Sequence, residues 1–139
     1  MTHTILAPAA TLIVWTLVML VWMAVTRGPA IAKLAPDRLK TGARGADLEG
    51  IIDERTNWKA HNYEHLLEQP TIFYPIVFIL ALAGFTATDV ALAWIYVALR
   101  VAHSVWQATI NRQPVRVLLF LLASLLLIAL GLRALASVV

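Results

Sequence analysis

Four apolar segments, each long enough to cross a bilayer, constrain the fold of this chain more than any other feature. A helix needs about 20 apolar residues to span the ~30 Å hydrocarbon layer. The segments of about that length are 5–26, 66–85, 90–108 and 115–136. Because hydrocarbon offers backbone polar groups no outside partner, such segments are expected to be helical. We therefore predict an all-α integral membrane protein, a four-helix bundle that forms one domain over residues 1–139.

The composition supports a membrane protein and argues against a nucleic-acid-binding one. Of the 139 residues, 60% are hydrophobic and 14% are charged. The mean hydropathy is +0.78, which is more than a soluble domain of this size hides in its core. The net charge is +3, but seven of the eleven basic residues lie between Arg27 and Lys59, beside an apolar segment. This clustering is a topology signal rather than a footprint for nucleic acid.

The absence of cysteine narrows the possible chemistry. The chain has none, so disulfides, cysteine-ligated metals and a protein thiol nucleophile are excluded. Any thiol chemistry would therefore need a thiol supplied by a small molecule.

The distribution of Lys and Arg predicts how the chain crosses the membrane. The first apolar segment lacks the basic n-region of a signal peptide and is too long for its apolar core, so we interpret it as a transmembrane helix. The connection 27–65 and the turn at Arg112 are basic, whereas the turn 86–89 has no Lys or Arg. By the positive-inside rule the basic connections are cytoplasmic, and both termini lie on the non-cytoplasmic side.

Capping and helix-breaking residues predict where the helices begin and end. The early part of the first connection, 28–45, is rich in helix breakers and is expected to be a loop. From Asp47, which we expect to be an N-cap, we predict a helix that continues into the second span and bends at Pro70 and Pro75. We also expect Asp89 to cap the third helix and Pro114 to occupy the first turn of the fourth.

The third apolar segment carries a stripe of polar residues. They are Tyr96, Arg100, His103, Gln107 and Asn111. Their spacing of four, three, four and four residues places them on one helix face. A charge inside a membrane is costly unless it has a partner, so such a stripe usually lines a functional site. Alternatively, these groups serve only to form hydrogen bonds between helices.

A matching polar face is expected on the second helix, where His61, His65 and Glu68 are spaced by four and three residues. Glu68 is the natural ion-pair partner of Arg100, because either charge alone would be strongly unfavourable at that depth. These residues, with His103, also resemble part of a metal or haem site. Because a full ligand set is not evident, we predict no metal site.

Arg112 and Arg116 form a basic corner one helical turn apart, on either side of Pro114. Such a pair is compatible with an anchor at the membrane edge. Arg116 falls just inside the fourth span, near the level expected for His103 and Gln107. The alternative is therefore a partly desolvated, basic cavity for a small anion.

Three sequence motifs together resemble one family. They are Trp-x-Tyr-Val-x-x-Arg-Val-Ala-His at 94–103, Asn-Arg-x-Pro-x-Arg at 111–116 and Asn-Tyr-x-His-Leu-x-Glu-x-Pro-x-x-Phe-Tyr at 62–74. The first two resemble the third and fourth helices of the membrane-associated proteins in eicosanoid and glutathione metabolism (MAPEG). The Arg-Val-Ala-His run is similar to the prostaglandin E synthase branch, and the motif at 62–74 is similar to the second helix of bacterial members.

The resemblance implies a homotrimer of four-helix subunits in a bacterial inner membrane, with glutathione as co-substrate. The activity that it implies is a glutathione-dependent transferase or peroxidase acting on a lipophilic electrophile that enters from the lipid bilayer. By position, Arg116 corresponds to the arginine thought to stabilise the glutathione thiolate. The resemblance also implies a set of residues that line or bind glutathione. They are Arg100, His103, Glu68, His65, His61, Gln107 and Arg112.

At several positions the chain differs from the family pattern. His61 stands in place of an arginine on the second helix, and Gln107 in place of an aromatic hydroxyl. Val117 replaces a polar residue and Phe120 a tyrosine on the fourth helix. These differences leave a second function open, namely a non-catalytic membrane trimer on the same scaffold that binds lipid or a partner protein.

Overall fold

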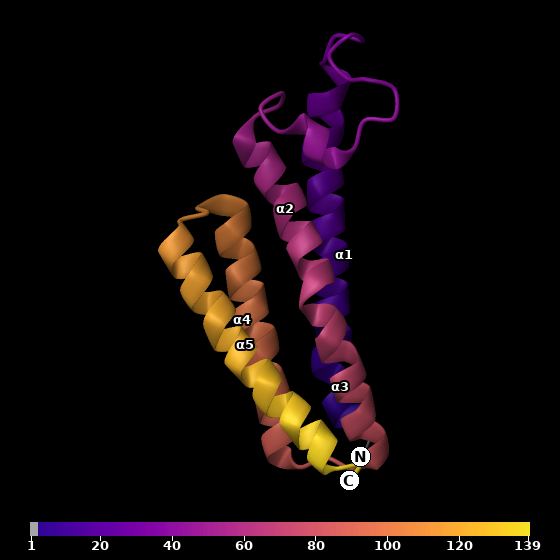
Figure 1. The fold of residues 1–139 in the computed structure, drawn as a ribbon, viewed down its shortest axis with the longest axis vertical. Helices are drawn as coiled ribbons and strands as arrows, with labels where there is room; N and C mark the ends of the chain where they lie inside the picture. Colours follow the sequence, from indigo (N-terminus) through magenta and orange to yellow (C-terminus); the bar gives the residue numbers. More distant parts are fainter. Residues whose placement is uncertain (1–2) are drawn as a thin grey trace.

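The computed structural model describes residues 3–139 and is all-α, with no strand in that range. Its helices are α1 (His3–Ala32), the short 3₁₀ helix η1 (Gly45–Leu48), α2 (Glu54–Glu68), α3 (Pro70–Ala83), α4 (Ala87–Thr109) and α5 (Gln113–Ala136). The α2 and α3 helices follow one another as a single rod. Together with α1, α4 and α5 this rod forms a bundle whose members run alternately in opposite directions (Figure 1). The predicted four-helix bundle is therefore confirmed for the described residues.

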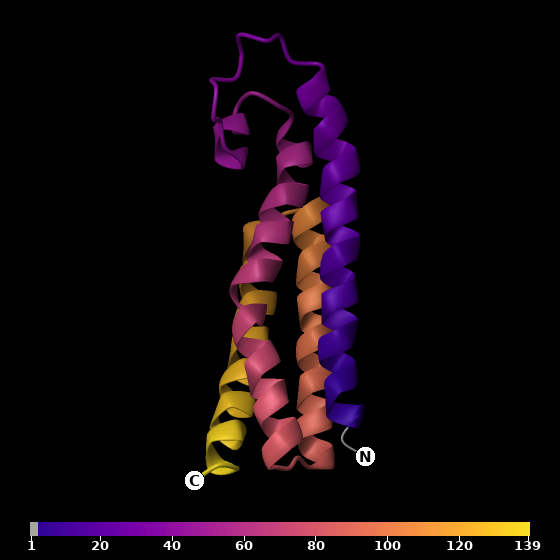
Figure 2. The ribbon, with the colours of Figure 1, turned by 90° about the vertical axis from the view of Figure 1, so that its right-hand side faces the viewer.

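Three of the rods in the described range are long and apolar enough to cross a membrane, namely α1, α2 with α3, and α5. The α4 helix is not among them, although a span was predicted at 90–108, because its polar stripe lowers its hydropathy. It nevertheless packs lengthwise against α1, α2 and α5 (Figure 2). Neighbouring helices therefore shield its polar face, and the protein is an integral membrane protein.

The α1 helix is longer than the span predicted for it. It continues through Pro29 to Ala32, and its 30 residues extend about 45 Å, beyond the ~30 Å hydrocarbon layer. The end of α1 and the first turns of α2 project past the α4–α5 turn (Figure 1). Both basic connections lie toward this end, and the C-terminus lies at the other. We also predicted that the N-terminus lies on the non-cytoplasmic side. That prediction concerns Met1 and Thr2, which lie outside the described residues.

The helix predicted to begin at Asp47 begins instead at Glu54, so that prediction is wrong. Between η1 and α2, Gly50 adopts φ +71°, a left-handed conformation that interrupts a helical backbone. Asp47 serves the 3₁₀ helix, where its carboxylate accepts a hydrogen bond of 2.6 Å from the backbone N–H of Arg44. The N-cap of α2 is Asp53.

The other signals at helix ends are mostly confirmed. Pro70 opens α3, and Gln69 before it keeps a helical backbone conformation. Pro114 lies in the first turn of α5, as predicted. At α4 the N-cap is Thr86 rather than Asp89, because the Thr86 hydroxyl accepts from the Asp89 N–H while the Asp89 carboxylate accepts from the Thr86 N–H (2.7 Å). The two residues form a capping box, so Asp89 contributes to the cap without being the N-cap.

Arg27 fastens the first connection to the helices. Its guanidinium donates hydrogen bonds to the carbonyl of Gly45 and to Asn57 Oδ1 (3.2 Å). Asn57 Nδ2 in turn donates to the carbonyl of Leu48 (3.2 Å). A Cβ at Gly45 would lie 3.0 Å from Arg27 Nη1, so a larger residue there would push the guanidinium away. These bonds hold η1 against α1 and α2.

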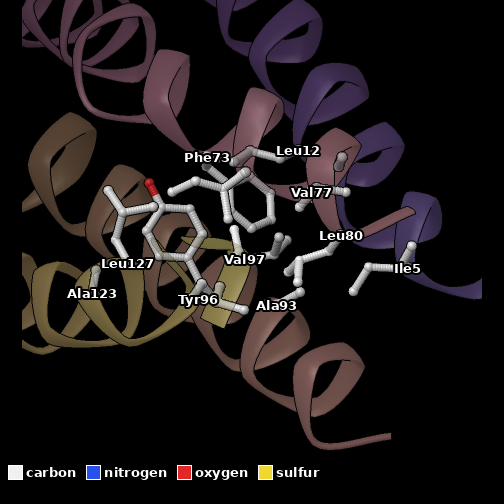
Figure 3. Close-up of a cluster of buried hydrophobic side chains, with 14 of the residues drawn as sticks. Ile5, Leu12, Phe73, Val77, Leu80, Ala93, Tyr96, Val97, Ala123 and Leu127 are labelled. Carbon is white, nitrogen blue, oxygen red and sulfur yellow. The ribbon is translucent and has the colours of Figure 1, made fainter. Parts of the chain in front are cut away.

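An apolar core fills the part of the bundle away from these connections (Figure 3). The rings of Phe73 and Tyr96 pack with their centroids 4.5 Å apart. Leu12 and Leu80 belong to the same buried cluster. The Tyr96 hydroxyl lies at the edge of the cluster in Figure 3, where it can reach a polar partner. The outward helix faces are also apolar, as contact with a lipid bilayer requires.

We expect Phe73→Ala to lower the free energy of unfolding by about 3–5 kcal/mol, the usual cost of emptying a buried phenylalanine site. Phe78→Ala, on the same helix but 59% exposed, is the matched control and should cost much less. Both losses are measured by denaturant unfolding in detergent micelles. Equal losses in the two variants would contradict the placement of Phe73 in the core.

Candidate functional site

The polar stripe of α4 is buried inside the bundle, as its spacing predicts. Tyr96, Arg100, His103 and Gln107 are each at most 7% exposed. Asn111 follows the end of α4, in the turn to α5. The stripe therefore places a guanidinium and an imidazole among packed helices, where a cation is costly unless polar groups surround it.

Arg100 is held by neutral oxygens rather than by the acid predicted as its partner. Its guanidinium donates to the backbone carbonyl of His65 (2.8 Å) and to Gln69 Oε1 (3.4 Å). The side chain of Glu68 is 69% exposed, and its carboxylate is hydrogen-bonded to His65 Nδ1 (2.8 Å). Within the described chain the predicted Arg100–Glu68 ion pair is therefore wrong. Just before Pro70 it is Gln69, not Glu68, that turns inward.

A small hollow opens beside these residues. It is lined by His65 of α2, His103 of α4 and three residues of α5, Arg116, Val117 and Phe120, and has a volume of about 190 Å³. The ring centroids of His65 and His103 lie 4.9 Å apart, and that of Phe120 lies 5.5 Å from His65. Three helices thus build one hollow that is lined by two imidazoles, a guanidinium and two apolar side chains.

The turn between α4 and α5 orients Arg116. The guanidinium donates a hydrogen bond of 2.6 Å to Asn111 Oδ1. Asn111 has φ +55°, in the left-handed region that asparagine tolerates better than most residues. Trp106 Nε1 braces the same turn by donating to the carbonyl of Arg112 (3.1 Å). The side chain of Arg112 itself is exposed and does not line the hollow.

Other residues predicted for the site lie outside the hollow. His61 contacts the carboxylate of Glu49 and so ties α2 to the first connection. Gln107 is buried, and its Oε1 has no hydrogen-bond partner among the described residues. Across residues 3–139, no three His, Asp or Glu side chains gather closely enough to hold a metal ion.

Two polar residues that the sequence did not single out connect the helices around the hollow. Gln69 Nε2 donates to Ser124 Oγ (2.7 Å), and the Ser124 hydroxyl donates to the carbonyl of Phe120 (2.8 Å). Gln69 Oε1 also accepts from the Tyr96 hydroxyl (3.4 Å). Positions three and four residues after His65 share one helix face, so spacing alone did not distinguish Gln69 from its neighbour.

Comparison with known proteins identifies a family. The model described as MAPEG family matches residues 5–136. No curated protein and no solved structure matches the chain. The matched range includes every residue of the hollow.

We expect Asn111→Ala to lower the free energy of unfolding by about 1–2 kcal/mol, because alanine is disfavoured at positive φ. Asn111→Gly is the matched control, since it loses the same hydrogen bond to Arg116 but adopts this φ freely. The glycine variant should therefore be the more stable of the two when both are unfolded in micelles. An alanine variant at least as stable as the glycine variant would contradict the described geometry of the turn.

Proposed function

This chain belongs to the MAPEG family, and from that premise we propose that it is a membrane-bound, glutathione-dependent transferase or peroxidase acting on lipophilic electrophiles. The observation that carries the proposal is the hollow that brings together His65, His103 and Arg116 from three helices. A fixed cation beside a partly apolar cavity is the environment that favours an anionic sulfur nucleophile.

In this proposal Arg116 stabilises the thiolate of glutathione. A free thiol has a pKa of about 8.5, so most of it is protonated near neutral pH. A guanidinium in a low-dielectric site favours the thiolate, and arginine suits the role because it does not give up its own proton. One nitrogen of Arg116 donates to Asn111, which leaves further N–H groups for sulfur.

The imidazoles of His65 and His103 form the remainder of the polar wall in this proposal. Each neutral ring has one donor and one acceptor. The donor of His65 is directed to the Glu68 carboxylate, so His65 offers its Nε2 acceptor and His103 offers both groups to orient the polar end of the thiol. Arg100 lies behind these imidazoles and donates a hydrogen bond to the His65 carbonyl. Its charge adds to the positive potential of the hollow. Glu68, His61, Gln107 and Arg112 are proposed to contact the more distant groups of glutathione.

The apolar wall formed by Val117 and Phe120 is proposed to receive the electrophile. In a transferase reaction the thiolate forms a bond to carbon, and the leaving group departs with the electron pair of the broken bond. In a peroxidase reaction the thiolate attacks a peroxide oxygen, and the displaced alkoxide takes up a proton. The attack leaves the sulfur of glutathione as a sulfenic acid. A second glutathione then reacts with this sulfenic acid to give glutathione disulfide and water.

The size of the hollow supports a site completed by a second subunit. Its volume of about 190 Å³ is below the roughly 300–1,000 Å³ of pockets for drug-sized ligands. We propose that the hollow takes the thiol end of glutathione and that a neighbouring subunit of a homotrimer covers the remainder. We further propose that the protein lies in a bacterial inner membrane, with the basic connections cytoplasmic and both termini on the non-cytoplasmic side. Within the family, we propose that it is a bacterial-type member similar to the prostaglandin E synthase branch.

One observation favours a second candidate function. Val117 and Phe120 line the hollow, and Leu118 and Leu121 of the same helix are exposed. These apolar side chains suit an acyl chain as well as an electrophile. The alternative is therefore a non-catalytic membrane trimer that binds lipid or a partner protein.

We expect Arg116→Ala to lower kcat/KM for conjugation of glutathione to a generic aromatic electrophile by on the order of 10²-fold, as when one electrostatic donor is removed from an active site. Arg38→Ala, which removes an exposed positive charge from the first connection, is the matched control and should retain the wild-type rate. The rates are measured with purified protein in micelles.

Equal rates for the wild type and Arg116→Ala would remove Arg116 from the mechanism. If the wild type shows neither a rate nor a thermal shift with glutathione, the catalytic proposal fails. An acyl chain that co-purifies with such an inactive protein would support the second candidate.

A further inference from the structure

Gln69 connects three of the helices around the hollow. It lies at the junction of α2 and α3, and its Oε1 accepts hydrogen bonds from Tyr96 and Arg100 of α4 (both 3.4 Å). Its Nε2 donates to Ser124 of α5 (2.7 Å). Ser124 in turn bonds to the carbonyl of Phe120, whose ring lines the hollow. The side chain of Gln69 therefore fixes the position of Arg100 relative to the wall formed by α5.

The neighbours of Gln69 determine how its amide is oriented. A guanidinium can only donate hydrogen bonds, so the amide oxygen must face Arg100 and the amide nitrogen then faces Ser124. One neutral side chain thus supplies an acceptor to a buried cation and a donor to α5. A carboxylate here would also accept from Arg100, but it would add a negative charge.

The positive charge of Arg100 is not cancelled within the described chain. Its side chain is fully buried, its hydrogen bonds go to two neutral oxygens, and its Nε has no partner among residues 3–139. Glu68 does not pair with it, since that carboxylate is mostly exposed and is hydrogen-bonded to His65. Because His103 lies one helical turn from Arg100 on the same face, the uncancelled charge is close to the hollow.

We propose that Gln69 is a positioning residue, which holds Arg100 beside the hollow while leaving its charge uncancelled. The hollow then presents two cations to one anionic ligand, Arg116 at its wall and Arg100 behind it. The inference rests on the proposed function in taking that ligand to be the glutathione thiolate. It adds that the neutral amide at residue 69, in place of a carboxylate, sets the affinity for the anion.

The decisive variant is Gln69→Glu. A glutamate retains acceptors for Tyr96 and Arg100, and it forms an ion pair with Arg100. It loses the donor to Ser124, and the Ser124 hydroxyl can donate to the new carboxylate by turning from the Phe120 carbonyl. Its unfolding temperature in micelles should therefore equal or exceed that of the wild type. Its affinity for glutathione, measured by isothermal titration calorimetry, should fall on the order of tenfold because the added charge opposes the anion. The thiol of bound glutathione should also ionise at higher pH, as followed by the ultraviolet absorbance of the thiolate.

Thr41→Glu is the control. It adds the same negative charge at an exposed residue of the first connection, where water and salt screen the new charge. It should weaken glutathione binding much less than Gln69→Glu does. A purely structural role for Gln69 predicts no loss of affinity in a folded Gln69→Glu protein, so the two roles give different results.

Each failure has a distinct meaning. If Gln69→Glu binds glutathione as tightly as the wild type, this inference is overturned while the proposed function stands. A Gln69→Glu protein that does not fold would overturn the hydrogen-bond assignment on which the inference rests. If the wild type binds no glutathione, the proposed function fails. Titration with inorganic sulfate then tests the inference alone, since weaker sulfate binding by Gln69→Glu supports it and equal binding overturns it.

Discussion

A guanidinium buried among membrane helices is the constraint on which the arrangement of this bundle depends. A charge at such a depth is costly unless polar groups surround it, and Arg100 is surrounded by a backbone carbonyl and an amide oxygen. The carbonyl belongs to His65 in the last turn of α2, where a helix end carries partial negative charge. The end of α2 therefore lies where the cation needs it.

The same residue divides α4 into an apolar half and a polar half. Before Arg100, residues such as Ala93 pack in the core. After it, His103 faces the hollow, and Ser104 accepts a hydrogen bond of 3.0 Å from Trp15 of α1. Because α4 is not among the helices of the described chain that are apolar enough to span a membrane alone, it depends on its neighbours to keep its polar groups away from lipid. The site is thus a consequence of how the bundle packs.

The sequence predicted the helices and the buried stripe because both follow from patterns longer than one turn. Apolar length gives the spans, and a spacing of three and four residues gives the common face of 96–107. Which of Glu68 and Gln69 contacts Arg100 could not be predicted from the sequence, because that depends on the local twist where α2 meets α3. A backbone carbonyl that accepts a hydrogen bond cannot be predicted from a pattern of side chains. The positive φ of Asn111, which orients Arg116, was equally hidden, because asparagine in a turn adopts several conformations.

The unequal heights of the helices bear on how a ligand reaches the site. The α1 and α2 helices rise beyond the α4–α5 turn (Figure 1), and Arg116 lies in the first turn of α5. The hollow is therefore near the rim of the shorter pair of helices, with the taller pair standing behind it. In the proposed function, a lipophilic electrophile would approach the hollow from the lipid beside α4 and α5, and the thiol would approach from water along the projecting ends of α1 and α2.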